Sequence, residues 1–172
     1  MRKAPLVVAL SLVLALSLFD HGNVAHAQVI CSGHTRQLGW SVYGSDRGDL
    51  IDCSGSTANL VIIGLGGNDI LIGGRGRDVI VGGNGDDYLF GLDGNDFLNG
   101  GNDSDSLFGG AGDDTLKAGG GPDLLLGGSG RDALFGGDGD DVLFGGRGID
   151  LCDGQDGDDF AGSDCEGPVN IP

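Results

Sequence analysis

The sequence has very few glutamates, basic residues and prolines. It contains one glutamate, Glu166, against 25 aspartates, and only nine lysines and arginines among 172 residues. Because glutamate favours helices whereas aspartate favours turns and loops, this bias excludes a helical repeat. It also excludes an EF-hand, whose calcium loop ends in a glutamate. The net charge of −17 would repel phosphates, which speaks against nucleic acid as a partner.

Glycine is abundant instead, with 38 residues, and it recurs in a phrase of nine residues. Eleven copies run without an insertion from Gly64 to Gly162, and GGNGDDYLF (82–90) and GGDGDDVLF (136–144) are two of the cleanest. A period of nine with only four prolines excludes collagen, in which glycine recurs every third residue. A fixed period without insertions indicates that each copy is one structural unit stacked on its neighbours.

Aspartate occupies the sixth position of every copy. The glycines before it allow positive φ angles, so the backbone can turn its carbonyl oxygens inwards. Carbonyls and a short carboxylate make an all-oxygen site, which suits Ca²⁺ with its six to eight ligands. The loops contain no thiol or imidazole, which speaks against zinc or copper. The candidate metal ligands are Asp69, Asp78, Asp87, Asp96, Asp105, Asp114, Asp123, Asp132, Asp141, Asp150 and Asp159.

The last three residues of each copy favour a short β-strand, since many are β-branched or aromatic. Side chains alternate along a strand, so the eighth residue points opposite to the seventh and ninth. The eighth residues are therefore expected to form an inner core. They are Leu71, Ile80, Leu89, Leu98, Leu107, Leu116, Leu125, Leu134, Leu143, Cys152 and Ala161.

These copies resemble the RTX, or haemolysin-type, calcium-binding repeat, whose consensus is GGxGxDxUx with U a large apolar residue. The resemblance covers residues 64–162. It implies an all-β fold, a calcium-stabilised parallel β-roll, in which two consecutive copies complete one coil. Odd-numbered copies then stack on one side of the roll, and even-numbered copies stack on the other.

With that stacking, each calcium ion is expected between the loops of every second copy, with aspartates from both, such as Asp87 with Asp105 or Asp114 with Asp132. Six odd copies leave five gaps and five even copies leave four, so the roll would hold up to nine Ca²⁺ ions. Loop carbonyls should contribute near Gly73, Gly82, Gly91, Gly100, Gly109, Gly127, Gly136 and Gly145.

Two copies depart from the consensus. GGNDSDSLF has Asp103 where the fourth glycine belongs, and AGGGPDLLL begins with Ala118 and contains Pro122. Gaps that use these loops, such as Asp105 with Asp123, are expected to be the weakest. The alternative to a folded repeat is a solvated acidic linker, but a linker would not keep a leucine or isoleucine two residues after nearly every sixth-position aspartate.

Residues 1–27 have the pattern of a secretory signal peptide. Arg2 and Lys3 form its basic start, an apolar core runs from Leu6 to Phe19, and Ala25 to Ala27 is a small-residue cleavage site. A membrane anchor is the alternative, but this core is shorter than the roughly 20 residues that span a bilayer. The protein is therefore expected to be secreted, with cleavage after Ala27.

The remaining chain contains four cysteines, Cys31, Cys53, Cys152 and Cys165. An even number in a small exported protein favours disulfides. A roll of this length separates its two ends by far more than the roughly 7 Å that a disulfide tolerates between Cα atoms. The expected pairs are therefore Cys31–Cys53 and Cys152–Cys165, one at each end. A thiol metal site is the alternative, although no CxxC spacing occurs.

The flanking segments are expected to cap the roll. Residues 28–63 contain two eroded copies, GSDRGDLID (44–52) and GSTANLVII (55–63), in which only Asp49 keeps the sixth position. Residues 163–172 form a short C-terminal cap. About 36 residues ahead of the repeats are too few for a catalytic domain. The chain beyond residue 27 has one histidine, His34, and no nucleophile or phosphate-loop motif, so no enzyme activity is expected.

A row of apolar residues is predicted on the outside of one sheet. The ninth positions of the odd copies include Phe90, Phe108 and Phe144, in copies three, five and nine. Such a row marks either a surface for self-association or a protein partner, or simply β-strand propensity. The sequence thus predicts a secreted calcium-binding protein that calcium folds. An adhesion or assembly subunit that uses the apolar row is the alternative.

Overall fold

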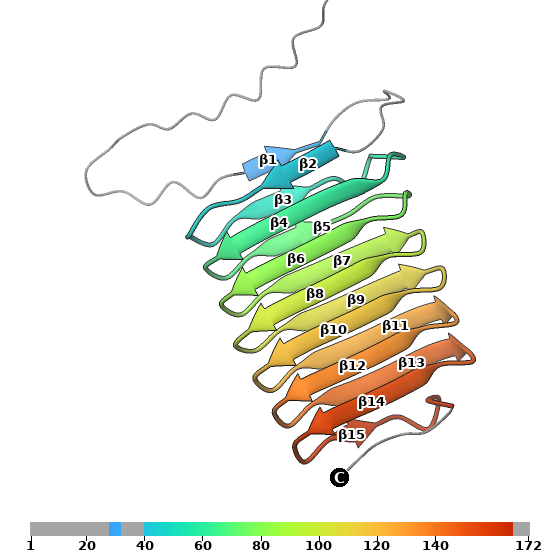
Figure 1. The fold of residues 1–172 in the computed structure, drawn as a ribbon. Coiled ribbons are helices and arrows are strands. Elements are labelled where there is room, and N and C mark those ends of the chain that lie inside the picture. The colour runs from blue at the N-terminus through green and yellow to red at the C-terminus, as the bar shows by residue number, and fades with distance from the viewer. Residues whose placement is uncertain (1–27, 32–39, 167–172) are drawn as a thin grey trace, which may run out of the picture.

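The structure is a computed structural model in which residues 28–31 and 40–166 are described, and these residues form two parallel β-sheets (Figure 1). The eight-stranded sheet comprises β1 (Gln28–Ile30), β3 (Leu50–Asp52), β5 (Ile70–Ile72), β7 (Tyr88–Asp93), β9 (Ser106–Ala111), β11 (Leu124–Gly130), β13 (Val142–Gly148) and β15 (Phe160–Ala161). The seven-stranded sheet comprises β2 (Trp40–Tyr43), β4 (Leu60–Gly66), β6 (Val79–Asn84), β8 (Phe97–Asn102), β10 (Thr115–Gly120), β12 (Ala133–Asp138) and β14 (Leu151–Asp156).

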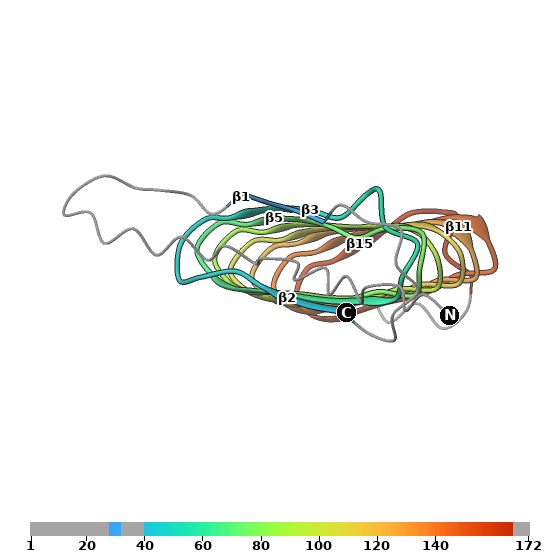
Figure 2. The same cartoon turned by 90° about the horizontal axis from the view of Figure 1, so that it is seen from above.

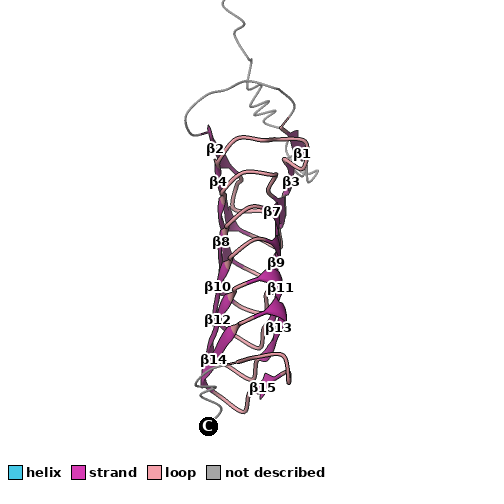
Figure 3. Cartoon of the chain, turned by 90° about the vertical axis from the view of Figure 1, so that its right-hand side faces the viewer, coloured by secondary structure: helices cyan, strands magenta, loops and turns pink. Residues whose placement is uncertain are grey.

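Each strand pairs in parallel with the strand two further along the chain, which is the arrangement of a β-roll. Leu89 aligns with Leu107 and Leu116 with Leu134, so each repeating coil consists of two copies of the repeat. Seen from above, the coils superpose as a flattened ring whose long sides are the two sheets (Figure 2). Viewed from the side, the two sheets lie opposite each other along the length of the roll (Figure 3). The predicted all-β parallel roll, with odd and even copies on opposite sheets, is confirmed.

The eighth residues of the copies fill the space between the sheets. From Leu71 to Cys152 every one of them is completely buried, as predicted. Burial of each leucine or isoleucine contributes roughly 1.5–3 kcal/mol. Ala161 is only partly buried, because β15 is the last strand of its sheet and no further coil covers it.

The sheets continue N-terminally beyond the repeats. In the eroded copies, Ile51 on β3 and Ile62 on β4 are completely buried and extend the inner core. The coil that joins β3 to β5 is two residues longer than the later coils, because residues 53 and 54 lie between the two eroded copies. The roll therefore begins before the first consensus repeat.

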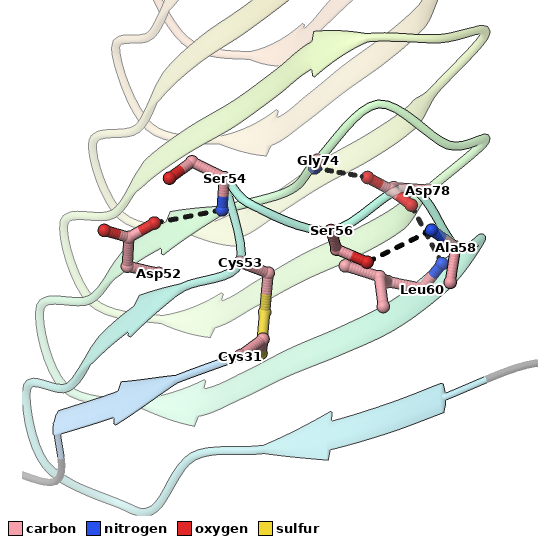
Figure 4. The surroundings of a disulfide bond; sticks show 9 residues. All are labelled: Cys31, Asp52, Cys53, Ser54, Ser56, Ala58, Leu60, Gly74 and Asp78. Atoms are coloured by element: carbon pink, nitrogen blue, oxygen red, sulfur yellow. Dashed lines mark hydrogen bonds between the residues drawn. A yellow bond between two sulfur atoms is a disulfide. The ribbon is translucent and has the colours of Figure 1, made fainter. Parts of the chain in front are cut away.

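Two disulfides close the ends of the roll, in the predicted pairs. Cys31 joins Cys53 with 4.5 Å between the Cα atoms, which ties the end of β1 to the turn after β3 (Figure 4). Cys152 joins Cys165 with 5.7 Å between the Cα atoms, at the other end. Each bond therefore fastens one end of the roll, where the edge of a sheet is otherwise open.

Alanine substitutions at two adjacent glycines should differ in their effect on stability, because only one of the two positions lies close to the preceding coil. Gly119 has a φ of 123°, and a Cβ there would collide with the carbonyl oxygen of Gly101 in the preceding coil. At Gly120 a Cβ would meet nothing within 4 Å. We expect Gly119→Ala to lower the free energy of unfolding in calcium by about 1–3 kcal/mol, and Gly120→Ala to change it little. Chemical denaturation measures both, and equal effects would contradict the close stacking of the loops.

Candidate metal centre

The sixth-position aspartates lie in the turns that connect the two sheets. Ten of the eleven, from Asp69 to Asp150, are at most 4% exposed, and Asp159 in the last copy is partly buried. The odd copies place theirs at one edge of the roll and the even copies place theirs at the other, since each coil has one turn at each edge. The molecule thus contains two ladders of buried carboxyl groups, which we call the odd and even aspartate ladders.

Consecutive aspartates of a ladder are in direct contact. Oδ1 of each accepts a hydrogen bond from the backbone N–H of the preceding aspartate of its ladder, as from Asp96 to Asp114 and from Asp114 to Asp132, both within 2.9 Å. The same bond spans all nine predicted gaps. The structure therefore brings together the predicted pairs. The repeat pattern did not reveal that one carboxylate oxygen would be engaged by the neighbouring coil's backbone.

The second oxygen of these carboxylates has no hydrogen-bond partner. Oδ2 is buried and unpartnered in every ladder aspartate except Asp78. Oδ2 of Asp78 accepts a hydrogen bond of 2.7 Å from the backbone N–H of Gly74 (Figure 4). A buried charged oxygen without a partner is costly. So many of them, repeated at each coil, indicate that a cation fits beside them.

Backbone oxygens converge on the same space. A Cβ on Gly109 would lie 2.5 Å from Oδ2 of Asp114 and 2.6 Å from the carbonyl oxygen of Gly127. Only glycine leaves that space free for the two oxygens. Gly127 begins the next copy on the same edge, so its carbonyl and the carboxylate come from consecutive coils. Gly127 is one of the loop glycines near which the sequence predicted a carbonyl ligand.

Further carbonyls lie between these two coils. A Cβ on Gly128 would collide with the carbonyl oxygen of Gly110, and a Cβ on Gly130 would collide with that of Gly112. Carboxylate and carbonyl oxygens are the hard ligands that Ca²⁺ prefers. The donor set at the gap between copies six and eight therefore fits calcium.

Side chains alone do not make a metal centre here. Within residues 28–31 and 40–166, no three histidine, cysteine, aspartate or glutamate side chains form a group that could hold a metal ion. Each gap offers carboxylates from its two loops, so a metal ion held there would also need backbone carbonyls as ligands.

The hydrogen bond of the ladder is also present between the two copies that depart from the consensus. Asp103, in place of the fourth glycine, takes a left-handed φ of 75°. The backbone N–H of Asp105 still donates to Oδ1 of Asp123 at 2.7 Å. This hydrogen bond is similar to those at the other gaps, so the geometry does not distinguish this gap. The weaker metal binding expected here stays a prediction.

Comparison with protein families agrees with this arrangement. The model of the RTX calcium-binding nonapeptide repeat matches residues 63–98, 90–125, 99–134, 117–152 and 126–161, which together exceed half of the chain. The chain belongs to the RTX calcium-binding nonapeptide repeat family. No curated protein sequence matches it. The RTX repeats imply calcium binding, and the buried aspartates in the turns are consistent with it.

Burial also changes the acidity of the RTX carboxyl groups. It raises the pKa of Asp105 to about 8 and the pKa values of Asp87 and Asp96 to about 7. For Asp69 and Asp114, burial raises the pKa to about 6. Hydrogen bonds from the backbone offset the rise in pKa only in part, and neighbouring carboxylates add to it. Near neutral pH, the metal-free roll must therefore bear buried negative charge or take up protons.

Lower pH should stabilise the metal-free fold. The pKa values are higher in the folded state than the ordinary 3.8, so the folded state binds more protons between pH 4 and pH 8. Its stability is therefore highest at acidic pH and falls as the pH rises through about 6 to 8. Urea denaturation of calcium-free protein should give a higher midpoint at about pH 5 than at about pH 8. A midpoint that rises with pH would contradict buried, charged ladders.

Proposed function

We propose that this RTX protein is a secreted calcium-binding protein whose stacked loops hold Ca²⁺ and whose roll folds when calcium binds. The observation that carries the proposal is the set of buried, unpartnered Oδ2 atoms in two ladders. The proposed ligands are the eleven sixth-position aspartates, with carbonyls of the loop glycines. The sites are structural, and the protein binds calcium rather than catalysing a reaction.

Charge neutralisation gives calcium its effect on folding. Without residues 1–27 the chain loses Arg2, Lys3 and Asp20, which leaves 7 basic and 25 acidic residues and a net charge of −18. Nine Ca²⁺ ions would supply a charge of +18, one ion for each predicted gap. Repulsion among so many carboxylates opposes a compact state, and bound metal removes that opposition.

Export is part of the proposal. The predicted signal peptide, with cleavage after Ala27, lies outside the described residues. The two disulfides support an extracellular protein, because such bonds persist in oxidising compartments. The millimolar calcium outside cells is also the range in which extracellular modules bind the ion. No helix in the described part of the chain is long and apolar enough to cross a membrane.

A calorimetric titration tests calcium binding. Residues 28–172 should bind several Ca²⁺ ions, up to nine, and equal Mg²⁺ should not replace them. Magnesium requires a tighter octahedron and gives up its water reluctantly. Asp113→Ala is a matched control, since Asp113 is exposed and pairs with Arg131 outside the ladder. The absence of heat from calcium, or an equal response to magnesium, would refute the proposal.

An adhesion or assembly subunit is the second candidate function. The observation that favours it is the alignment of Phe90 with Phe108 on neighbouring strands of the eight-stranded sheet. Both functions are compatible, because the aspartate ladders lie in the turns and the phenylalanines lie on a sheet face.

A further inference from the structure

We propose that the outer face of the eight-stranded sheet is a dimer interface for a second copy of this chain. We call it the odd face, and it consists of the seventh and ninth residues of the odd-numbered copies, from β5 to β15. The proposal goes beyond calcium binding, although it rests on the calcium-dependent folding proposed above. In Figure 3 this sheet is the one on which β7, β9 and β11 are labelled.

The odd face has a continuous apolar row along the roll. Ile72, Phe90, Phe108, Leu126 and Phe144 align on five consecutive strands. The rings of Phe90 and Phe108 stack with 4.7 Å between their centroids. Phe144 is 37% exposed, and Tyr88, in a seventh position of the same face, is 50% exposed. These side chains therefore present apolar surface to solvent.

The distribution of charge favours a second copy as the partner. No seventh or ninth residue of an odd copy is charged, although the chain is strongly acidic. The corresponding face of the other sheet includes Lys117 and Asp153. Two odd faces can thus meet about a two-fold axis without placing carboxylates opposite each other. The equal spacing of the strands lets the apolar rows of the two copies interdigitate, as an isologous interface requires.

The available area is that of a weak dimer. The strands lie about 4.8 Å apart and rise about 3.3 Å per residue, so the six strands from β5 to β15 give a face of about 500 Å², because β5 and β15 have only three and two residues. Two copies would bury about 1,000 Å² in total, which is the size of a weak or transient interface. We therefore expect a reversible dimer with a dissociation constant of tens of micromolar, on the order of 10⁻⁵ M.

Analytical ultracentrifugation in millimolar calcium tests the interface. The wild-type protein, at concentrations up to about 0.1 mM, should sediment as a dimer. The triple variant Phe90→Thr, Phe108→Thr, Phe144→Thr keeps strand propensity and should be a monomer. The matched control Val79→Thr, Phe97→Thr, Phe135→Thr changes the face of the other sheet and should remain a dimer. Circular dichroism and calcium titration of the same samples report separately whether each variant folds and binds metal.

The single variant Tyr88→Lys provides a second test if the triple variant does not fold. It places a charge in the odd face and alters a half-exposed side chain, so it should abolish the dimer and leave calcium binding intact. A wild-type monomer overturns the proposal, whether the face then stays bare, is covered by another part of the chain or binds a different protein. Dimers that persist in both odd-face variants overturn it as well.

Discussion

Removal of calcium at about pH 8 should abolish most of the β-sheet signal of residues 28–172. Carboxyls such as those of Asp69, Asp87 and Asp96, with pKa values of about 6 to 7, are then mostly ionised and buried without a counterion. With dissociation constants near 10⁻⁴–10⁻³ M, each site contributes about 0.4–1.4 kcal/mol at millimolar calcium. Nine sites contribute about 4–13 kcal/mol, which is comparable to the whole stability of a typical domain. Circular dichroism during a calcium titration measures the change.

Magnesium is the control for this experiment. An equal concentration of Mg²⁺ should leave the spectrum coil-like, and salt alone should likewise restore little of the sheet signal. A metal-free protein with a full β-sheet spectrum at pH 8 would contradict calcium-dependent folding. Its inner core and hydrogen bonds would then be sufficient without metal.

Asp114→Ala should weaken calcium-dependent folding more than Asp159→Ala. Asp114 takes part in two gaps, since its Oδ1 accepts from Asp96 and its backbone N–H donates to Asp132. Asp159 accepts from Asp141 only, in the last gap of the odd ladder. Either substitution leaves one backbone N–H without its acceptor, that of Asp96 or that of Asp141, but loss of Asp114 removes a carboxylate from two proposed metal gaps rather than one. The calcium midpoint should therefore rise several-fold.

The neighbouring Asp113→Ala variant is the control for Asp114→Ala. Asp113 carries the same charge but is exposed, so the calcium midpoint should change little. Calorimetry should also give a lower stoichiometry for Asp114→Ala than for Asp159→Ala. Equal stoichiometries and midpoints in these two variants would argue that the stacked loops do not share ligands.

The sequence predicted the roll because the same nine positions recur in every copy. The fixed period determined the length of a coil. The eighth residues determined the inner core, since alternation along a strand leaves only one inward position among the last three. The cysteine pairs followed from distance alone, because the roll keeps Cys31 far from Cys165. Each of these arguments needs only the position of a residue within the period.

Features that depend on backbone direction could not be predicted. The repeat pattern does not tell which oxygen of Asp114 accepts the N–H of Asp96, because that depends on the orientation of the peptide in the turn. Nor does it show that Asp49 in an eroded copy accepts hydrogen bonds from the backbone N–H and the hydroxyl of Ser45. The left-handed backbone of Leu92 also departs from the preference of its residue type.

Anomalous scattering from crystals grown in calcium would locate the ions directly. Peaks should appear inside the turns at both edges of the roll, between the stacked loops of consecutive coils. At the gap between Asp114 and Asp132, a peak should lie within coordination distance of Oδ2 of Asp114 and the carbonyl oxygen of Gly127. Peaks confined to the exposed carboxylates of the surface, with none between the stacked loops, would contradict the account.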